Sequence, residues 1–130
     1  MTYSKMTLHR GDVILCKIPL PSEELTSFKR RPAVVVSKNS NNERLEDVIV
    51  AICTSNLSRK QEPTQYLITG AEIDLAGIKV ASVVKCESLL TINKSMIMRV
   101  LGNLSAKGSQ AVNDCLKGAL ALNKVERADA

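Results

Sequence analysis

The chain has 130 residues, enough for one domain whose core needs neither disulfides nor a metal ion. It carries 18 Lys and Arg against 13 Asp and Glu, and this net charge of +5 favours an anionic partner without proving one. It has two Tyr, one Phe and no Trp, which argues against a protein that grips single strands mainly by base stacking.

The cysteines are spread along the chain and never form a Cys-x-x-Cys pair. We therefore expect small buried thiols in a reducing compartment, with a zinc or redox site as the less favoured alternative. They are Cys16, Cys53, Cys86 and Cys115. No apolar stretch approaches the roughly 18 residues that a membrane span needs, and no signal-peptide pattern is visible. The expected location is the cytoplasm, without membrane contact.

The N-terminal half alternates short apolar runs with polar connections. Gly11 and Asp12 mark the turn that opens the first run. Strands are expected over residues 13–18, 33–36 and 47–53, of which the second and third are the continuous apolar kind that is buried on both faces. Surface loops are expected over residues 22–31, 37–46 and 54–62.

The second half predicts further strands and one terminal helix. A half-exposed strand over 63–69, a long strand within 79–92, a helical turn over 93–96 and a strand over 97–101 are expected. Ser105 can cap a helix whose apolar residues repeat at helical spacing. These residues are Val112, Cys115, Leu116, Ala119 and Leu120. Gly108 and Gly118 each weaken that helix by about 1 kcal/mol, so packing must hold it.

These elements predict one α+β, mainly β, domain over residues 1–130. Its architecture is expected to be a small half-open barrel with a C-terminal helix against it. The ordered core is expected over about 8–122, with 123–130 as a frayed tail.

Several kinds of catalytic site are excluded by the sequence. His9 is the only histidine, which makes Ser-His-Asp and Cys-His arrangements improbable. No zinc-protease motif, P-loop or dinucleotide-binding glycine motif is present.

The remaining candidates for chemistry lie at strand ends and on the long strand. Guanidinium and hydroxyl groups that converge at strand ends suit a phosphate; here they come from Arg31, Thr54 and Ser55. Lys85 and Glu87 are two residues apart on one strand, so their side chains share a face. Each also has a plainer interpretation: an exposed ion pair, a solvated arginine, or hydroxyls that cap a turn.

Six segments, in order and spacing, resemble the MazF/PemK family of toxins. They are Arg10-Gly-Asp-Val, Arg31-Pro-Ala-Val-Val, Ala51-Ile-Cys-Thr-Ser, Val83-Val-Lys-Cys-Glu, Leu90-Thr-Ile-Asn and Val100-Leu-Gly-Asn-Leu-Ser. The resemblance covers nearly the whole chain. It implies an SH3-like barrel, a homodimer and a cognate antitoxin encoded nearby. It also implies cleavage of single-stranded RNA at short sequences, without a metal ion or another cofactor.

The resemblance also assigns roles. Arg31 and Thr54 fall at active-site positions of the family, and the Arg and Asp of the PemK-like branch are replaced here by Lys85 and Glu87. RNA supplies its own nucleophile, the 2′-hydroxyl, so a base, an acid and donors to the phosphorane suffice. Glu87 is expected as the base and Lys85 as the acid. Arg31, Thr54 and Ser55 would stabilise the phosphorane charge.

The loop before Arg31 departs from the family, because many relatives carry Gly-x-Glu-Gln there and this chain does not. Its last residues suit RNA contact, with one ring for stacking and two charges for phosphates. The expected RNA-binding residues are Phe28, Lys29, Arg30, Asn56, Arg59 and Lys60. Base preference is expected to reside in residues 22–30 and 55–62.

Two alternatives share the fold. One is a degenerate toxin that binds RNA or its antitoxin without cutting. The other is a gyrase-inhibiting toxin, which is disfavoured because the C-terminal helix lacks an aromatic end. Apolar surface for a homodimer is expected near Leu89, Leu90 and residues 96–98.

Overall fold

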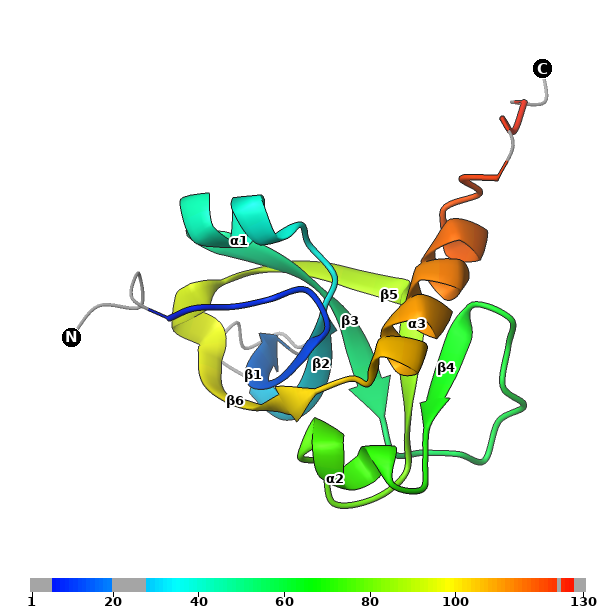
Figure 1. Ribbon diagram of the computed structural model, residues 1–130, viewed down its shortest axis with the longest axis horizontal. Coiled ribbons are helices and arrows are strands. Elements are labelled where there is room, and N and C mark those ends of the chain that lie inside the picture. The colour runs from blue at the N-terminus through cyan, green and yellow to red at the C-terminus, as the bar shows by residue number, and fades with distance from the viewer. Residues whose placement is uncertain (1–5, 20–27, 124, 128–130) are drawn as a thin grey trace.

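A six-stranded antiparallel sheet, curled into a half-open barrel, forms the body of the protein (Figure 1). The computed structural model describes residues 6–19, 28–123 and 125–127. The strands are β1 (Asp12–Pro19), β2 (Phe28–Val35), β3 (Asp47–Thr54), β4 (Gln65–Ile68), β5 (Ser82–Asn93) and β6 (Ile97–Asn103). Their order across the sheet is β4-β5-β3-β2-β1-β6. The helices are α1 (Asn39–Arg44), α2 (Glu72–Ala76), the 3₁₀ turn η2 (Lys94–Met96) and α3 (Ala106–Ala119).

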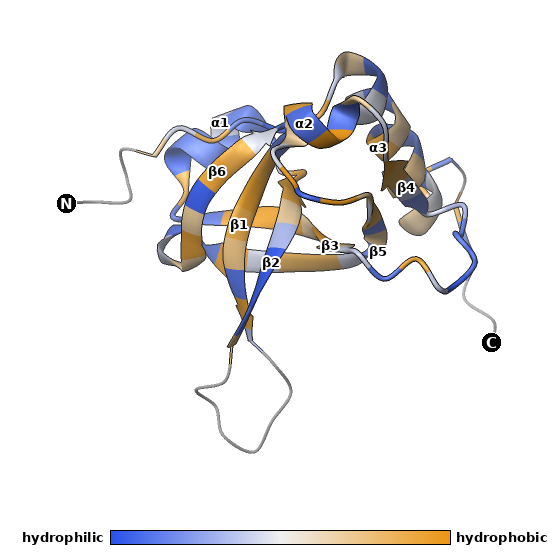
Figure 2. Ribbon diagram, turned by 90° about the horizontal axis from the view of Figure 1, so that it is seen from below, coloured by the Kyte–Doolittle hydropathy of each residue, from blue (hydrophilic) through white to orange (hydrophobic). Residues whose placement is uncertain are grey.

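The sheet buries apolar side chains on both faces, as the β-branched runs predict. One cluster fills the curl of the barrel and includes Ile14, Val35 and Val50. The other lies between the sheet and the helices and includes Val34, Val84 and Leu116. The first half of β2 is mostly hydrophilic and exposed, because it carries Lys29, Arg30 and Arg31, whereas its second half is mostly buried (Figure 2). The side chains of that first half are therefore available for a site.

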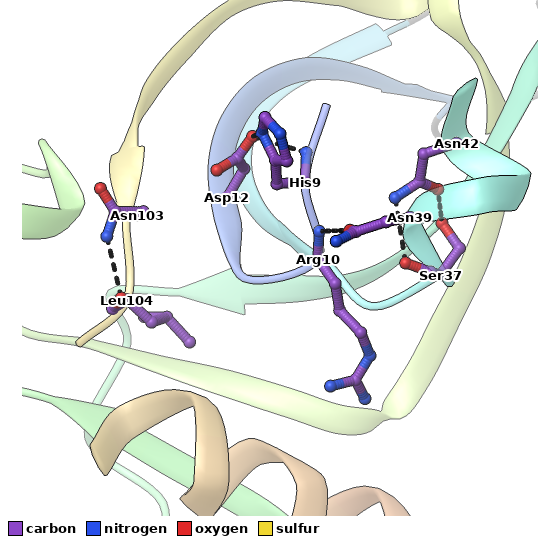
Figure 3. Close-up of polar contacts among 8 residues, drawn as sticks. All are labelled: His9, Arg10, Asp12, Ser37, Asn39, Asn42, Asn103 and Leu104. Carbon is purple, nitrogen blue, oxygen red and sulfur yellow. Dashed lines mark hydrogen bonds and ion pairs between the residues drawn. The ribbon is translucent and has the colours of Figure 1, made fainter. Parts of the chain in front are cut away.

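The turn before β1 has the predicted strand-entry geometry. The backbone N–H of His9 donates to the Asp12 carboxylate at 2.8 Å, and the N–H of Asp12 donates to the His9 carbonyl at 2.9 Å. Arg10 continues from this turn: its backbone N–H donates to Asn39 at 2.7 Å (Figure 3). Its guanidinium bonds the Val36 carbonyl at 2.8 Å. Arg10 thus joins the start of β1 to the chain that leaves β2.

Helix α1 corrects the expectation of a loop over residues 37–46. Its residues, Asn-Ser-Asn-Asn-Glu-Arg, have poor helix propensity, so a pattern search misses them. Buried contacts stabilise the helix instead. The Asn42 amide donates to the Ser37 carbonyl at 3.0 Å and accepts from the Ser37 hydroxyl (Figure 3). The buried Lys94 ammonium donates to the Asn42 carbonyl.

Two further expectations are wrong in their boundaries. Residues 28–31 belong to β2 rather than to a loop, because β1 pairs with them as far as Pro19 and Phe28. The segment between Gly70 and Gly77 contains α2, which was not predicted. The rest of the predicted 22–31 loop, residues 22–27, lies outside the described residues.

The predicted cap of α3 is confirmed and has a second layer. The Ser105 hydroxyl accepts from the Gly108 N–H at 2.9 Å and donates to Glu72 at 2.8 Å. The Glu72 carboxylate also accepts from the Ser105 N–H at 3.0 Å and from the Tyr66 hydroxyl. A Cβ at position 108 would lie 2.1 Å from a Glu72 oxygen. Because Gly108 has no side chain, the Glu72 carboxylate fits beside it. Through this carboxylate α2 and β4 are joined to the start of α3.

The predicted burial of the cysteines is confirmed for three and holds in part for the fourth. Cys16, Cys53 and Cys86 are buried, and Cys115 is half-buried on α3. Burial raises the pKa of the Cys53 and Cys86 thiols to about 12, so both stay protonated. Within the part of the chain that the structure describes, no helix is long and apolar enough to cross a membrane.

Candidate active site

An irregularity in β5 is the structural origin of the site. Leu89 of β5 lies opposite Ala51 of β3, whereas Lys85 lies opposite Ile52. Three residues of β5, numbers 86–88, therefore have no partner in the β3 ladder. Such bulges bend a strand and re-aim its side chains. This one takes Glu87 out of the regular ladder.

The N-terminal end of β4 fixes the bulge. The Cys86 N–H donates to the Thr64 carbonyl at 3.1 Å. The Thr64 hydroxyl and the Gln65 amide donate to the two Glu87 oxygens at 3.0 and 2.6 Å. Burial acts to raise the pKa of Glu87, but the bonds from Gln65 and Thr64 and the charge of Lys85 outweigh it. The pKa lies below its usual value, and Glu87 is ionised at neutral pH.

A polar pocket of about 450 Å³ opens in front of this carboxylate. It is lined by Thr54, Asn56, Arg59, Lys60, Glu62, Gln65, Val83, Lys85 and Glu87. Six of the residues predicted from the sequence thus meet in one place. Within the described residues no contact of ion-pair length joins Lys85 to Glu87, so the two are not the simple surface pair of the plainer interpretation.

The turn after β3 forms one wall of the polar pocket. The Thr54 hydroxyl oxygen accepts from the Asn56 N–H at 3.1 Å. The Asn56 side chain accepts from the N–H and hydroxyl of Ser58 at 3.0 and 2.7 Å. Thr54 therefore does cap a turn, as its plainer interpretation predicts. Its hydroxyl proton is not used by that bond and can be donated into the pocket.

A second pocket, of about 390 Å³, lies where β2 and β3 diverge. The two strands pair at Ala33 and Ile52, and within the described residues no pair lies beyond these. We call it the cationic pocket. It is lined by Leu15, Lys29, Arg30, Arg31, Pro32, Cys53, Ser55, Gly77, Ile78, Lys79, Val80, Ser82, Arg99 and Leu101.

The predicted site residues are therefore divided between two pockets. Arg31 and Ser55 line the cationic pocket, whereas Thr54, Lys85 and Glu87 line the polar one. Phe28 is 47% exposed on β2 and lines neither.

The chain shows where the two pockets come closest. Thr54, the last residue of β3, lines the polar pocket. Ser55, the next residue after Thr54, belongs to the other pocket. The boundary between the polar and the cationic pocket therefore falls between Thr54 and Ser55.

Some residues of the pockets were not foreseen. Thr64 and Gln65 bond Glu87 across 23 and 22 positions of sequence, a distance at which no local pattern gives a signal. Lys79 and Arg99 are visible as charges, but only the fold brings them beside Arg31. Across residues 6–19, 28–123 and 125–127 no group of three or more His, Cys, Asp or Glu side chains is arranged to hold a metal ion.

Comparison with known proteins assigns this barrel to a class of toxins. The family described as PemK-like, MazF-like toxin of type II toxin-antitoxin system matches residues 9–120. The chain belongs to this family, which confirms the resemblance found in the sequence.

Individual relatives agree with that assignment. An endoribonuclease MazF of Staphylococcus saprophyticus is 28% identical over 119 residues, which are 91% of this chain and 95% of that protein. A mycobacterial endoribonuclease solved with its cognate antitoxin has a TM-score of 0.71 at 22% identity, over 88% of this chain and 96% of that one. MazE–MazF from Deinococcus radiodurans gives 0.71 at 18% identity, over 91% and 99%. These structures confirm the predicted half-open barrel with its C-terminal helix.

Proposed function

We propose that this chain is the toxin of a type II toxin–antitoxin pair and that it cleaves single-stranded mRNA at short sequences without a metal ion. The chain is an endoribonuclease in this proposal. The observation that carries it is the β5 bulge, which sets an ionised Glu87 beside Lys85 and Thr54 in one pocket. An mRNA substrate implies that it acts in the cytoplasm.

The proposed chemistry is an intramolecular transfer at phosphorus. Glu87 takes the proton from the 2′-hydroxyl, and the resulting oxygen attacks the adjacent phosphorus. Lys85 gives a proton to the departing 5′-oxygen. The products are a 2′,3′-cyclic phosphate and a 5′-hydroxyl. The lowered pKa of Glu87 keeps it in the proton-accepting state at neutral pH, and Lys85 donates more readily than arginine would.

The phosphorane carries extra negative charge that the strand ends can stabilise. Arg31 lies on β2 and Thr54 at the end of β3, each two residues beyond the last β2–β3 pair, and Ser55 follows Thr54 directly. Guanidinium and hydroxyl donors fixed before the reaction are the arrangement that lowers the energy of such a charge. In this proposal the scissile phosphate lies over the strand ends, between the two pockets.

The partners proposed for the chain are RNA, a cognate antitoxin and a second copy of itself. Two of the structures with the same fold are toxin–antitoxin complexes. A homodimer is supported by an apolar groove of about 400 Å³ beside the end of α3. Its apolar lining residues are Val36, Ile49, Leu89, Leu116, Leu120 and Leu122. Of the surface predicted from sequence, Leu89 lines this groove and Met98 is exposed on β6. Leu90, Met96 and Ile97 instead pack in the cluster inside the barrel.

The test is to incubate a long single-stranded RNA with the purified protein in EDTA and to map the ends of the products. We expect cuts at one short motif, with cyclic-phosphate and 5′-hydroxyl ends. Arg31→Ala should lower the rate by roughly 10²–10³ while the protein stays folded. Intact RNA at micromolar protein would contradict the nuclease and favour the degenerate toxin. Inhibition of gyrase by the same preparation would instead favour the gyrase-directed alternative.

A further inference from the structure

The cationic pocket holds more positive charge than the proposed chemistry uses. Five of its lining residues are Lys or Arg, and none is Asp or Glu. They come from three parts of the chain: Lys29, Arg30 and Arg31 from β2, Lys79 from the segment before β5, and Arg99 from β6. None of the five is in an ion pair with a carboxylate of the described residues. Clustered cations repel one another, so the pocket is suited to an anion.

The register explains how two distant strands supply the same pocket. Leu15 of β1 lies opposite Pro32 of β2 on one side and opposite Arg99 of β6 on the other. Residues that lie abreast in antiparallel strands project on the same face. Arg99 and Pro32 therefore share a face across three strands. Two residues further along β1, Lys17 lies opposite Arg30 and adds one more charge at the border.

The pocket also has apolar and hydroxyl groups in its lining. Leu15, Ile78 and Leu101 lie among the cations. Ser55 and Ser82 add hydroxyl groups. Apolar side chains with cationic and hydroxyl groups around them suit a nucleotide better than a bare ion, since the sugar and base can cover them.

The position of this pocket beside the strand ends links it to RNA. Thr54, the last residue of β3, lines the polar pocket, and the next residue, Ser55, lines the cationic one. If the reacting phosphate of an RNA strand lies over Thr54, the neighbouring nucleotide lies either in the polar pocket or in the cationic pocket. The polar pocket is lined by three cations and two carboxylates, whereas the cationic pocket is lined by five cations and no carboxylate. The cationic pocket therefore attracts a phosphate more strongly.

We propose that the cationic pocket binds the nucleotide next to the scissile phosphate, and that Lys79 and Arg99 hold the phosphate of that nucleotide. This inference rests on the proposed RNA substrate. Lys79 and Arg99 are binding residues here, and they take no part in bond breaking.

The experiment measures binding separately from cleavage. The probe is a fluorescent single-stranded RNA of mixed sequence, 2′-O-methylated throughout so that it lacks the nucleophile. Its affinity is measured for wild type, Lys79→Gln, Arg99→Gln and the double variant between 50 and 300 mM salt. Lys107→Gln is the matched control, because Lys107 is exposed on the first turn of α3 and lines neither pocket. Rates on unmodified RNA are measured in parallel.

Each lost phosphate contact should reduce the slope of log affinity against log salt by about 0.7, the value for single strands. If the contact contributes nothing to RNA affinity near 1 M salt, this slope predicts that each single variant binds about 8-fold more weakly at 50 mM salt and about 4-fold more weakly at 150 mM. Because the two residues share one phosphate, their losses do not simply multiply, and the double variant should lose between about 8-fold and about 60-fold at 50 mM. KM should rise accordingly, with kcat within about two-fold of wild type.

Three results would overturn the inference. If both variants bind the probe as Lys107→Gln does while wild type cuts RNA, the pocket is not the neighbouring subsite, and the nuclease itself stands. If RNA binding is unchanged but affinity for a 20-residue Glu/Asp-rich peptide falls, the pocket serves a protein partner. If kcat falls at unchanged affinity, the two residues act in the reaction. A wild type that neither binds nor cuts RNA removes the proposed function and the subsite with it.

Discussion

The two pockets at the ends of β2 and β3 are nearly equal in size and opposite in electrostatic design. The polar pocket contains both signs of charge, and its carboxylate Glu87 is fixed by two hydrogen bonds from β4. The cationic pocket contains one sign only, and its charges are not paired with carboxylates of the described residues.

This difference separates two tasks. Proton transfer needs groups that are held in place and in the right protonation state, so fixed bonds to Glu87 are useful there. Retention of a flexible anionic strand needs charge rather than exact geometry, so long unpaired side chains suffice. We therefore expect variants of the polar pocket to change kcat and variants of the cationic pocket to change KM.

The strongest test of this division is Glu87→Gln. Loss of the base should lower kcat by roughly 10²–10⁴ while RNA affinity stays the same or rises, because one negative charge is removed. Single-turnover cleavage and equilibrium binding measure the two quantities. Glu62→Gln is the control, since Glu62 lines the same pocket without a bond to the Glu87 carboxylate. Equal losses in both variants would mean that only the charge of the pocket matters.

A second test removes the ring of Phe28, which is 47% exposed on β2 beside the cationic residues. Phe28→Ala should weaken RNA binding by about 1–3 kcal/mol if the ring stacks on a base, with kcat unchanged. Leu45→Ala, at a comparably exposed apolar residue after α1, serves as the control. Equal RNA affinity of the two variants would exclude stacking at Phe28.

A third test destabilises the contact between α2 and α3 with a substitution at a residue that lines neither pocket. Gly108→Ala puts a methyl group against Glu72 and should cost about 1–3 kcal/mol in urea unfolding, despite the better helix propensity of alanine. Gly118→Ala meets nothing within 4 Å and should gain about 1 kcal/mol. Below the unfolding transition both variants should keep wild-type kcat and KM. A changed kcat in Gly108→Ala would show that α3 contributes to the site.

The smallest effect at neutral pH is expected for Gln65→Leu. The bond from Gln65 lowers the pKa of Glu87, so its loss should raise that pKa and move the acid limb of the kcat/KM profile to higher pH. At pH 7 the carboxylate remains ionised, and the rate should fall by about ten-fold or less through misorientation alone. An acid limb that stays in place would separate Glu87 from catalysis.

The same linkage affects stability, and its sign follows from the direction of the shift. A pKa that is lower in the folded than in the unfolded protein stabilises the fold above the ordinary Glu value of about 4.5, and this contribution is lost as the pH falls through the folded-state pKa. Gln65→Leu should therefore reduce stability more at pH 7 than in strong acid, where only the loss of the bond from the Glu62 N–H to the Gln65 side chain remains. Urea unfolding at several pH values measures this.

The sequence was most informative where one residue pattern decides one structural property. The run of Val34 and Val35 predicts a strand buried on both faces, and neither side chain is exposed. The same expectation for β3 is only partly right: Val48 and Val50 are buried, whereas Ile49 between them is 41% exposed. Ser105 predicts the cap of α3 from its chemistry alone. The spacing of Lys85 and Glu87 predicts a shared face, and both do line the polar pocket.

Where tertiary contacts decide, the sequence was less informative. Helix α1 depends on Asn42, whose carbonyl is bonded by Lys94 fifty-two positions later. The division of the site into two pockets depends on where β2 and β3 cease to pair, which the apolar pattern does not mark. The shared face of Lys85 and Glu87 was expected from a regular strand, yet it exists in a strand with a three-residue bulge.

The bulge in β5 has a further consequence for how this protein can change. Cys86 lies between Lys85 and Glu87 with its side chain fully buried, and its sulfur is 4.0 Å from the Val112 carbonyl of α3. The volume at position 86 therefore affects, from inside the core, the distance between the proposed acid and the proposed base. Substitutions there would alter catalysis without any contact with RNA. Which residues are accepted at position 86 should accordingly depend on the residues at positions 85, 87 and 112. Selection for activity would then act on the packing of the core.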